Sequence, residues 1–544
     1  MAQGPKDMVG GTEAEVASGG VGGQVGRNAA LMSALVLVSR LTGFLRTWGQ
    51  AYAIGVTVMA SCYSVANNLP NLLYELVVAG MLSTAFLPVY MSVKKRAGTE
   101  GASEYTSNLV SLSLIVMGTV TVLGFVFAAQ LVWTQSFSAT SEFDSDLAVW
   151  FFRFFVIEVV LYTLSSIFSG VLNAERDYLW SSAAPIFNNV VTTASFFAYA
   201  ALADSSPTLA LVILALGNPL GVAIQVVVQM PSMWHHGIRL RWRVDLHDPD
   251  LHDTLKIGIP AFVVMAADFV CSSVQSSAAL SVDATGASIA YYARLWYTLP
   301  YAILTVPVTT AMFTELSDSW SRGDEGSFRQ GITSGMRQIL FFMLPFMLYL
   351  IVFSIPLISV MAGSSFTDAQ VLTTAEYLSV YALSLPLYGI CMYLQKVVSS
   401  MRRMRLFALA CVIGAAVQVC LLLSLTTTFG LSFVPLTIFP YYVAIDAIVL
   451  VSLRRRLGPI GLRGTLASAA RSFAIGLAGA AVGAVVLVGL TVAFGSCLGS
   501  PARALVYTVC GGVPSLVVTY GLAFLWHMPE TAIIRSLARR VVRR

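Results

Sequence analysis

Two arginines interrupt an apolar run near the start of this chain that is long enough to cross a lipid bilayer. Arg40 and Arg46 lie within residues 29–48, and the next apolar run, 57–92, contains Pro70. A charge at mid-membrane depth costs at least ~2.5–3.5 kcal/mol on insertion scales, so it is expected to face a polar cavity. A proline frees a backbone carbonyl that a neighbouring helix or cavity water must satisfy. The two runs are therefore predicted to be membrane helices that line a hydrated space.

The composition predicts a protein that lies almost wholly in a membrane. Hydrophobic residues make up 57% of the chain and charged residues 11%, with a mean hydropathy of +0.78. Soluble domains carry about 25% charged residues. The seven cysteines form no CxxC pair and no zinc spacing, so we interpret them as small core residues. No polar segment is long enough to form a soluble domain.

Fourteen apolar stretches are long enough to span a bilayer, which takes about 20 helical residues. The preceding residues 1–27 are rich in Gly, lack an apolar stripe and are predicted to be a disordered cytoplasmic tail. The chain is therefore predicted to be an all-α polytopic membrane protein. The predicted spans are roughly 29–48, 57–92, 109–133, 147–172, 182–202, 208–230, 256–280, 288–315, 338–362, 375–400, 406–426, 433–453, 473–494 and 504–526.

The basic residues predict the orientation of these spans, because Lys and Arg concentrate in cytoplasmic loops. If the N-terminus is inside, the inner connections and tails carry nearly all of the 32 Lys and Arg residues, and the outer connections carry only Arg503. Four more lie within spans: Arg40, Arg46, Arg153 and Arg294. Both termini are therefore predicted to be cytoplasmic. The net charge of +5 then reflects membrane topology and indicates no nucleic-acid partner.

A faint internal repeat relates the first six spans to the next six. Leu69-Pro70 in the second span recurs as Leu299-Pro300 in the eighth, and the basic turn at Arg176 recurs at Arg405 with nearly the same offset. Transporters built from repeated halves place their binding site between the halves. The sequence therefore predicts two related six-helix halves, and Pro70 and Pro300 are predicted to break helices beside the site.

Short motifs spread through the first twelve spans resemble those of one transporter family. The first runs from Ser39 to Arg46 (SRLTGFLR), and the second from Leu69 to Leu73 (LPNLL). Further matches are Gly80, STAFLP at 83–88, Gly170 to Asn173, Pro185, Asn188, Gly258 to Pro260, Tyr291 to Leu295 and Gln395 to Val397. In this order the motifs resemble the signature of the MurJ (MviN) lipid II flippases, within the multidrug/oligosaccharidyl-lipid/polysaccharide exporter superfamily.

The resemblance implies two six-helix lobes around a central cavity, with two extra C-terminal helices that form a groove for the lipid tail. On that plan the chain divides into an N-lobe at 28–230, a cytoplasmic linker at 231–255, a C-lobe at 256–456, and helices 13–14 with a basic tail at 457–544. The implied function is to flip a lipid-linked peptidoglycan precursor, a polyprenyl diphosphate, from inner to outer leaflet by alternating access. The implied setting is the bacterial cytoplasmic membrane, with cell-wall synthesis proteins as candidate partners. No enzymatic step and no cofactor is implied beyond Na⁺ or membrane-potential coupling.

By the same resemblance, the essential cavity arginines of the family correspond to Arg40, Arg46 and Arg294. A guanidinium group stays charged and binds phosphate oxygens through two parallel hydrogen bonds, which suits a diphosphate. The competing interpretation is that these side chains snorkel to the membrane surface. Snorkelling is strained for Arg40, which lies ~17 Å from the inner end of its predicted span.

The sequence departs from the family pattern at four positions. Ser61 and Ala79 stand where the family has acids, and Tyr74-Glu75 stands where it has arginines. Ser61 and Glu75 are therefore candidate cavity residues with roles of their own. The departures leave open whether this chain is a main lipid II flippase or a diverged paralogue.

Several acidic residues lie inside predicted spans. Asp268 and Asp446 are candidates for a cation or coupling site, and Asp268 is equally suited to a structural ion pair with Arg294. Arg153 and Glu158 are close to an outer end of their span, so we interpret them as interfacial.

An acidic loop from Asp245 to Asp253 (DLHDPDLHD) has the residue types of a metal site, but we interpret it as a solvated loop and predict no bound metal. The loop is the only support in the sequence for a rival function, a membrane prenyl-acceptor transferase with Mg²⁺ on a pyrophosphate. That rival does not explain Arg40 and Arg46. Two more functions stay open: export of another polysaccharide lipid or of drugs, and a non-transporting scaffold role in wall synthesis.

Overall fold

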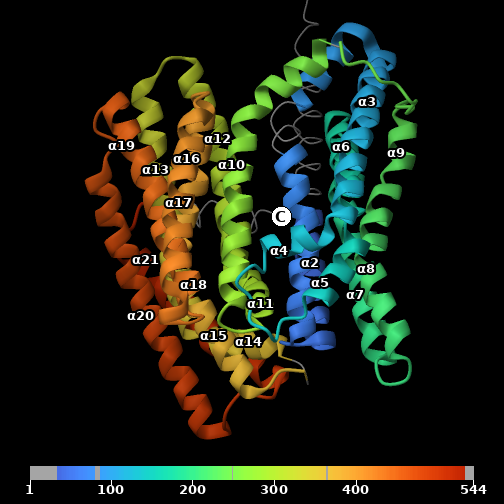
Figure 1. The fold of residues 1–544 in the computed structure, drawn as a ribbon. Coiled ribbons are helices and arrows are strands. Elements are labelled where there is room, and N and C mark those ends of the chain that lie inside the picture. The colour runs from blue at the N-terminus through green and yellow to red at the C-terminus, as the bar shows by residue number, and fades with distance from the viewer. Residues whose placement is uncertain (1–33, 80–85, 248, 363–364, 533–544) are drawn as a thin grey trace, which may run out of the picture.

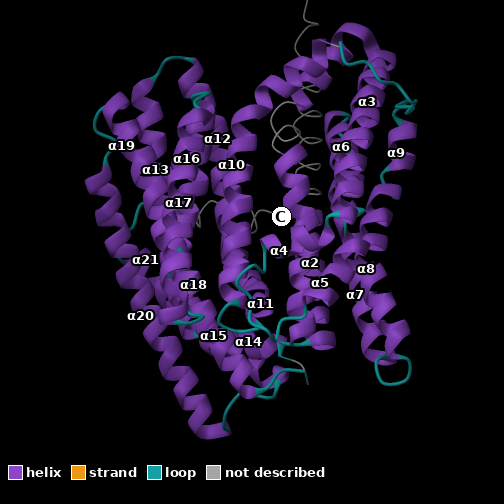
Figure 2. Cartoon of the chain, in the orientation of Figure 1, coloured by secondary structure: helices purple, strands orange, loops and turns teal. Residues whose placement is uncertain are grey.

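Every regular element that the structure describes is a helix. The computed structural model describes residues 34–79, 86–247, 249–362 and 365–532, without the side chains of 78–79 and 249–260. Figure 2 shows helices joined by loops and turns throughout this part of the chain. The all-α prediction is confirmed. The predicted tail at 1–27, the motif residues Gly80 to Ala85 and the Ala79 side chain lie outside the described residues.

Ten described helical segments are long and apolar enough to cross a membrane, and an eleventh is gained if α15 (Asp368–Ala382) and α16 (Leu385–Ser400) count as one span. These two helices meet at a bend of 47°. The described part of 29–48, most of 57–92, and 182–202 fall on helices outside this set. The polytopic membrane character is therefore confirmed, and the number of fourteen spans stays a prediction.

The helices fall into an N-terminal and a C-terminal set. The N-terminal set comprises the helix over 34–54, α2 Val58–Tyr74, the π-helix η1 Glu75–Ala79, α3 Leu87–Val126, α4 Ala128–Thr134, α5 Ser145–Phe155, α6 Glu158–Ala174, α7 Tyr178–Leu202, α8 Pro207–Val227 and α9 Met230–His235. The C-terminal set comprises α10 Pro249–Leu280, α11 Gly286–Pro300, the π-helix η3 Tyr301–Thr305, α12 Val306–Ser321, α13 Glu325–Val352, α14 Ser354–Met361, α15, α16, α17 Met404–Phe429, α18 Phe433–Leu436, α19 Ile438–Leu457, α20 Leu462–Phe494 and α21 Pro501–Leu525.

The two sets stand side by side (Figure 1). α3 and α5 to α9 gather on one side, α12, α13 and α16 to α21 gather on the other, and α2 and α10 face each other between them. Within the sets, α7 packs along α8, α10 along α17, and α20 along both α13 and α21. The junction between the sets is therefore formed by α2, α10 and α11, which also contacts α2.

The last two long helices approach each other closely because a glycine lies at their contact. A Cβ atom added at Gly479 of α20 would lie 1.9 Å from Thr519 Oγ1 of α21. Their outward-facing side chains are large, apolar and exposed, as at Val488, Val492 and Val517. Such a surface suits contact with lipid chains.

Interruptions of the helices occur at or near glycine and proline residues. α3 is two helices joined at Gly98, whose φ of +67° is a conformation that glycine adopts without strain. Pro70 lies within α2 five residues before η1, and Pro300 is the last residue of α11, directly before η3. A proline removes one backbone donor, and π-helical turns mark places where the regular hydrogen-bond ladder is interrupted.

The segment that joins the two sets runs alongside α3. Three α3 serines, one helical turn apart, accept hydrogen bonds from alternate backbone N–H groups of this segment, at 3.0–3.1 Å: Ser103 from Arg239, Ser107 from Arg241 and Ser111 from Arg243. Asn108 Oδ1 accepts from the N–H of Asp245 at 2.8 Å. The range 231–255, predicted as a linker, is thus partly helical, because α9 ends at His235 and α10 begins at Pro249.

Candidate functional site

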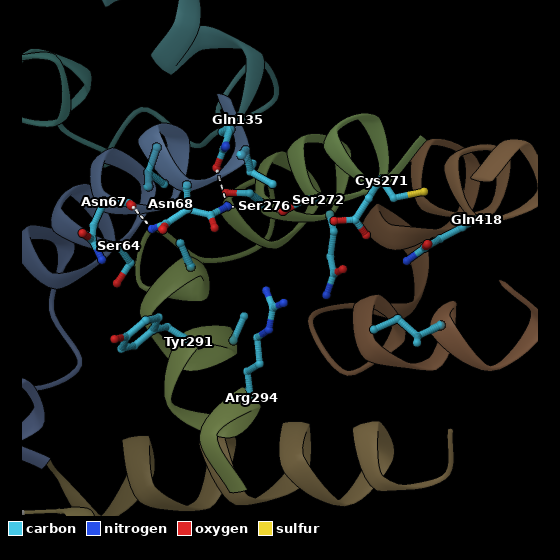
Figure 3. Close-up of a pocket in the computed structure, with 18 of the residues that line it drawn as sticks. Ser64, Asn67, Asn68, Gln135, Cys271, Ser272, Ser276, Tyr291, Arg294 and Gln418 are labelled. Carbon is cyan, nitrogen blue, oxygen red and sulfur yellow. Dashed lines mark hydrogen bonds between the residues drawn. The ribbon is translucent and has the colours of Figure 1, made fainter. Parts of the chain in front are cut away.

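A polar cavity of about 410 Å³ lies at the junction of the two sets of helices (Figure 3). α2 and η1 line it from the N-terminal set, and α10, α11, α15, α17 and α19 line it from the C-terminal set. Most of its polar groups are uncharged amides and hydroxyls: Ser64, Asn67, Asn68, Asn71, Gln135, Ser272, Gln275, Ser276, Gln418, Tyr291, Tyr381, Tyr441 and Tyr442. The cavity can therefore form many hydrogen bonds with a polar ligand.

A stripe of amides on α2 forms one wall. Ser64, Asn67, Asn68 and Asn71 recur three or four residues apart, which places them on one face of the helix. The Asn68 amide donates to Ser272 Oγ of α10 at 3.2 Å and to Gln135 Oε1 at 3.4 Å. This side chain therefore links the two sets of helices across the wall of the cavity.

Three charged residues line the cavity. Arg294 of α11 extends into it, as Figure 3 shows, and the carboxylates of Glu75 and Asp268 also line it. Asp268 and Arg294 interact electrostatically, and the structure records neither a hydrogen bond nor an ion pair between these two described residues. Arg294 therefore offers its hydrogen-bond donors to the cavity.

Arg46 lies behind the cavity wall. Its Nη2 donates to Asn218 Oδ1 at 2.8 Å, and Asn218 in turn donates to Asn67 Oδ1 in the cavity lining. Asn218 Nδ2 also donates to both carboxylate oxygens of Glu158, at 3.0 and 2.9 Å. One side chain, that of Asn218, thus links Arg46 to the lining residue Asn67.

Two other sequence candidates lie away from the cavity lining. Arg40 is exposed on the helix over 34–54. Ser61 is fully buried, and its Oγ accepts from the backbone N–H of Ser288 at 3.1 Å. The structure therefore does not bring Arg40, Arg46 and Arg294 together in one cavity, and Ser61 joins α2 to α11.

Asp446 is buried in α19 at 5% exposure, and it does not line the cavity. Neither of its carboxylate oxygens has a hydrogen-bond partner among the described residues. Asp446 and Asp268 therefore lie in different surroundings, and only Asp268 faces the cavity.

The interfacial interpretation is wrong for Glu158 and stays a prediction for Arg153. Arg153 is exposed and its guanidinium lies 5.6 Å from the centre of the Phe125 ring. Glu158 is fully buried. Glu158 is the first residue of α6, separated by two residues from the end of α5, and its carboxylate accepts hydrogen bonds from Asn218 of α8 in the interior.

Hydrogen bonds close the junction at the end of the molecule near α11 and α15 (Figure 1). Ser138 and Ser277 lie with their Oγ atoms 2.7 Å apart, and Tyr292 Oη donates to the backbone oxygen of Gly55 at 2.9 Å. Gln370 Nε2 donates to the backbone oxygen of Val56 at 2.7 Å. The two sets are therefore tied together on this side of the cavity.

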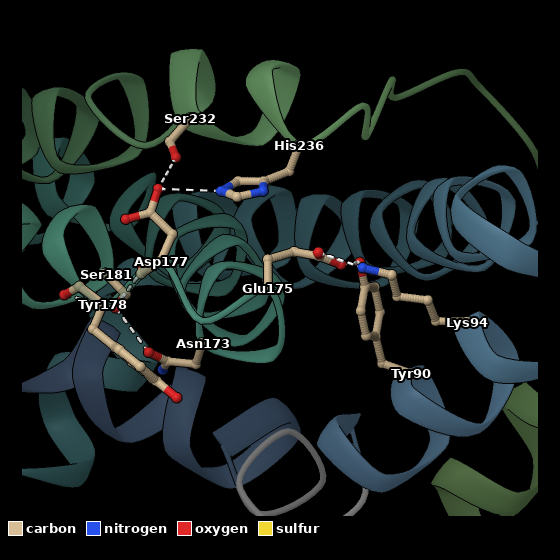
Figure 4. Close-up of polar contacts among 9 residues, drawn as sticks. All are labelled: Tyr90, Lys94, Asn173, Glu175, Asp177, Tyr178, Ser181, Ser232 and His236. Carbon is tan, nitrogen blue, oxygen red and sulfur yellow. Dashed lines mark hydrogen bonds and ion pairs between the residues drawn. The ribbon is translucent and has the colours of Figure 1, made fainter. Parts of the chain in front are cut away.

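A second polar cluster surrounds the turn between α6 and α7 (Figure 4). Glu175 pairs with Lys94 and accepts a hydrogen bond from Tyr90 at 2.7 Å, both from α3. On the other side of Arg176, which has a φ of +61°, Asp177 accepts from Ser232 and pairs with His236 at 3.4 Å. The turn therefore binds together α3 and the end of α9.

The sequence analysis missed the amides that dominate the cavity. Asn67, Asn68 and Asn71 lie in the second predicted span, where each amide needs a polar partner. This spacing on one face of an apolar helix is a signal that could have identified the cavity wall. Asn218 and Glu158 gave a similar signal as polar residues in apolar runs.

Comparison with known proteins gives consistent results. Residues 50–500 match the family model "Lipid II flippase MurJ". A relative in Bdellovibrio bacteriovorus, named a probable lipid II flippase MurJ, is 26% identical over 457 residues, which cover 80% of this chain and 83% of the relative.

Solved structures show the same fold. A lipid II flippase MurJ in an inward closed conformation superposes with a TM-score of 0.73 at 18% identity, covering 91% of this chain and 99% of that one. An inward-facing multidrug resistance transporter of the MATE family superposes with a TM-score of 0.64 at 15% identity, covering 78% of this chain and 94% of that one.

Proposed function

The chain belongs to the lipid II flippase MurJ family, and we propose that it moves a lipid II type precursor, a polyprenyl diphosphate that carries a glycan, from the inner to the outer leaflet. The family match over residues 50–500 and the apolar helices support a multi-pass protein of the bacterial inner membrane that acts as a transporter in peptidoglycan synthesis. The precursor would cross without covalent change.

The observation that carries this proposal is the polar cavity with Arg294 at the junction of the two helix sets. Sugar and peptide groups offer hydroxyls and amides, and the lining offers uncharged partners of the same kind. Arg294 supplies guanidinium donors that can bind phosphate oxygens in pairs. A diphosphate bound at Arg294 would leave the apolar polyprenyl chain to run out toward the lipid.

The three arginines would act at different places along the path. Arg294 would hold the diphosphate inside the cavity. Arg46 would act on it from behind the cavity wall, where Asn218 links Arg46 to the lining residue Asn67. Arg40 lies six residues before Arg46 and is exposed, so it would meet the headgroup before entry. Glu75 and Asp268 oppose an anion, and we propose that a bound cation such as Na⁺ offsets them. Asp446 is a second candidate for coupling.

We propose that transport occurs by alternating access between two lobes, residues 28–230 and 256–456, with residues 457–544 supplying the groove for the lipid tail. The hydrogen bonds at Ser138–Ser277 and Tyr292–Gly55 would have to break when the cavity opens on that side. The apolar exposed faces of α20 and α21 fit contact with a lipid tail. The membrane potential would assist the movement of a net charge across the membrane.

A second candidate function, export of an organic cation, has two observations in its favour. The cavity lining contains two carboxylates and one guanidinium, and the fold resembles a multidrug transporter of the MATE family. Loss of Arg294 would raise the affinity of a cation exporter for its substrate, whereas it would lower the affinity of a diphosphate flippase for its own. The two functions therefore predict opposite effects of the same substitution.

Complementation of cells depleted of their own lipid II flippase tests the proposal. The proposal expects growth and outer-leaflet precursor to be restored. A chain that inserts normally but restores neither would favour the organic-cation exporter or a non-transporting role in wall synthesis.

A further inference from the structure

A buried polar network beside the cavity contains an acid to which the proposed transport assigns no role. Glu158 is the first residue of α6, and Asn218 lies in α8; both are fully buried. The Asn218 amide donates to Glu158 Oε1 and Oε2 at 3.0 and 2.9 Å, and also to Asn67. Its oxygen accepts from Arg46 Nη2 at 2.8 Å. One amide therefore bridges a guanidinium and a carboxylate.

The network holds a buried guanidinium near a buried carboxylate. Arg46 Nε is buried and has no hydrogen-bond partner among the described residues. Glu158 is the carboxylate that interacts electrostatically with Arg46, and Tyr162 lies beside it one turn further along α6. A buried charge without a counter-charge is strongly destabilising, so the two groups depend on each other.

The bridge leads directly to the cavity. Asn67 accepts a hydrogen bond from Asn218 and at the same time lines the cavity, so the position of Arg46 is fixed relative to the wall that a ligand would touch. The interposed amide keeps the guanidinium and the carboxylate from direct contact. Arg46 can therefore exchange partners without breaking a tight ion pair.

We propose that Glu158 is a positioning residue for Arg46. Through Asn218 it holds the guanidinium behind Asn67, and its negative charge balances Arg46 until an anionic headgroup takes over that role. The second half of this statement rests on the proposed function, whereas the first half does not. Loss of the acid would leave a more positive cavity that binds an anion more tightly and releases it more slowly.

The test measures the potential in the cavity and needs no transport. A single cysteine replaces Asn71, which lines the cavity one turn from Asn67, in the full chain with its native cysteines changed to serine. The purified protein reacts with small methanethiosulfonate reagents, one anionic and one cationic, and the ratio of the two rates is recorded. At an effective dielectric of about 40, a unit charge ~10 Å from the thiol changes the two rates by roughly fourfold each in opposite directions, and so changes their ratio by on the order of tenfold.

Glu158→Gln is expected to raise the anionic-to-cationic rate ratio by on the order of tenfold, and Glu158→Asp, which keeps the charge, to leave it near the starting value. Glu376→Gln is the matched control, because Glu376 is an exposed acid on α15. An unchanged ratio in folded Glu158→Gln protein would overturn the proposal, because the acid would then contribute no charge at the cavity.

A second measurement covers the case in which Glu158→Gln does not fold. If the two charges balance each other, the double variant Arg46→Gln with Glu158→Gln should give folded protein where Glu158→Gln gives none, or unfold at a higher temperature than Glu158→Gln where both fold. A double variant that is no more stable than the single one would also overturn the proposal. A shifted rate ratio in a protein that transports nothing would refute the proposed function and leave the positioning role intact.

Discussion

Replacement of Arg294 by alanine is the sharpest perturbation of the cavity. Arg294 is the cation among the described residues that line it, together with Glu75 and Asp268. A guanidinium ~4 Å from a phosphate contributes about 4 kcal/mol at an effective dielectric of about 20. Net hydrogen bonds to charged groups contribute ~1.5–3 kcal/mol each. The Coulomb figure omits the cost of desolvating both groups, so we use the net contribution of one such hydrogen bond. The variant should then bind a polyprenyl diphosphate roughly 10 to 150 times more weakly.

Binding of a soluble short-chain analogue to detergent-purified protein provides the assay, and complementation provides the cellular readout. Arg294→Lys should recover only part of the affinity, because a point charge lacks the paired donors of a guanidinium. Arg153→Ala is the control, since Arg153 is exposed and stacks on Phe125 away from the cavity. Wild-type affinity in Arg294→Ala would refute the diphosphate site, and gained affinity for an organic cation would support the second candidate function.

Three further predictions follow from the packing and the topology. Oxidation of the double variant Ser138→Cys with Ser277→Cys should cross-link the two helix sets, because the two Oγ atoms lie 2.7 Å apart in the native protein. Transport should then stop until a reductant is added. Transport by the fully cross-linked protein would contradict alternating access at this end. Gly479→Ala should lower the free energy of unfolding by ~1–3 kcal/mol, because the new Cβ would lie 1.9 Å from Thr519 Oγ1. Gly489→Ala on the same helix is the control, because its Cβ would meet nothing within 4 Å, and it should leave the thermal melt unchanged. An impermeant thiol reagent should label a cysteine at the exposed Thr367 in intact cells and should not label one at Gly98 or Gly326; the reverse pattern would show that the assigned topology is inverted.

The helical fold could be predicted from the sequence because apolar runs of membrane length leave the backbone no other way to satisfy its hydrogen bonds. The connection between the predicted spans 57–92 and 109–133 is helical in the structure, within α3, and the regular helix is interrupted there at Gly98. The close approach of α20 and α21 also needed coordinates, since a glycine in an apolar run does not reveal which neighbour it admits.

Part of the cavity lining was predicted from the sequence, and the functional role of its residues stays a prediction. Glu75, Asp268 and Arg294 do line one cavity, because charges in apolar helices turn toward polar space. The predicted grouping of Arg40 and Arg46 with Arg294 was not found in the lining, since a residue's depth in a span says little about which face it occupies. Glu158 was misplaced for a related reason: its position near the end of a predicted span did not reveal that its side chain faces Asn218 in the interior.

The most direct test of the proposed function is flipping by the purified protein in liposomes. A fluorescent lipid II is incorporated into both leaflets, and an impermeant quencher reports how much becomes accessible from outside after an ion gradient or a membrane potential is applied. We expect wild-type protein to move unmodified lipid II between the leaflets, and protein with Arg294→Ala to move far less. Liposomes in which wild-type protein moves no lipid II, or converts it to a new product, would contradict the proposed function.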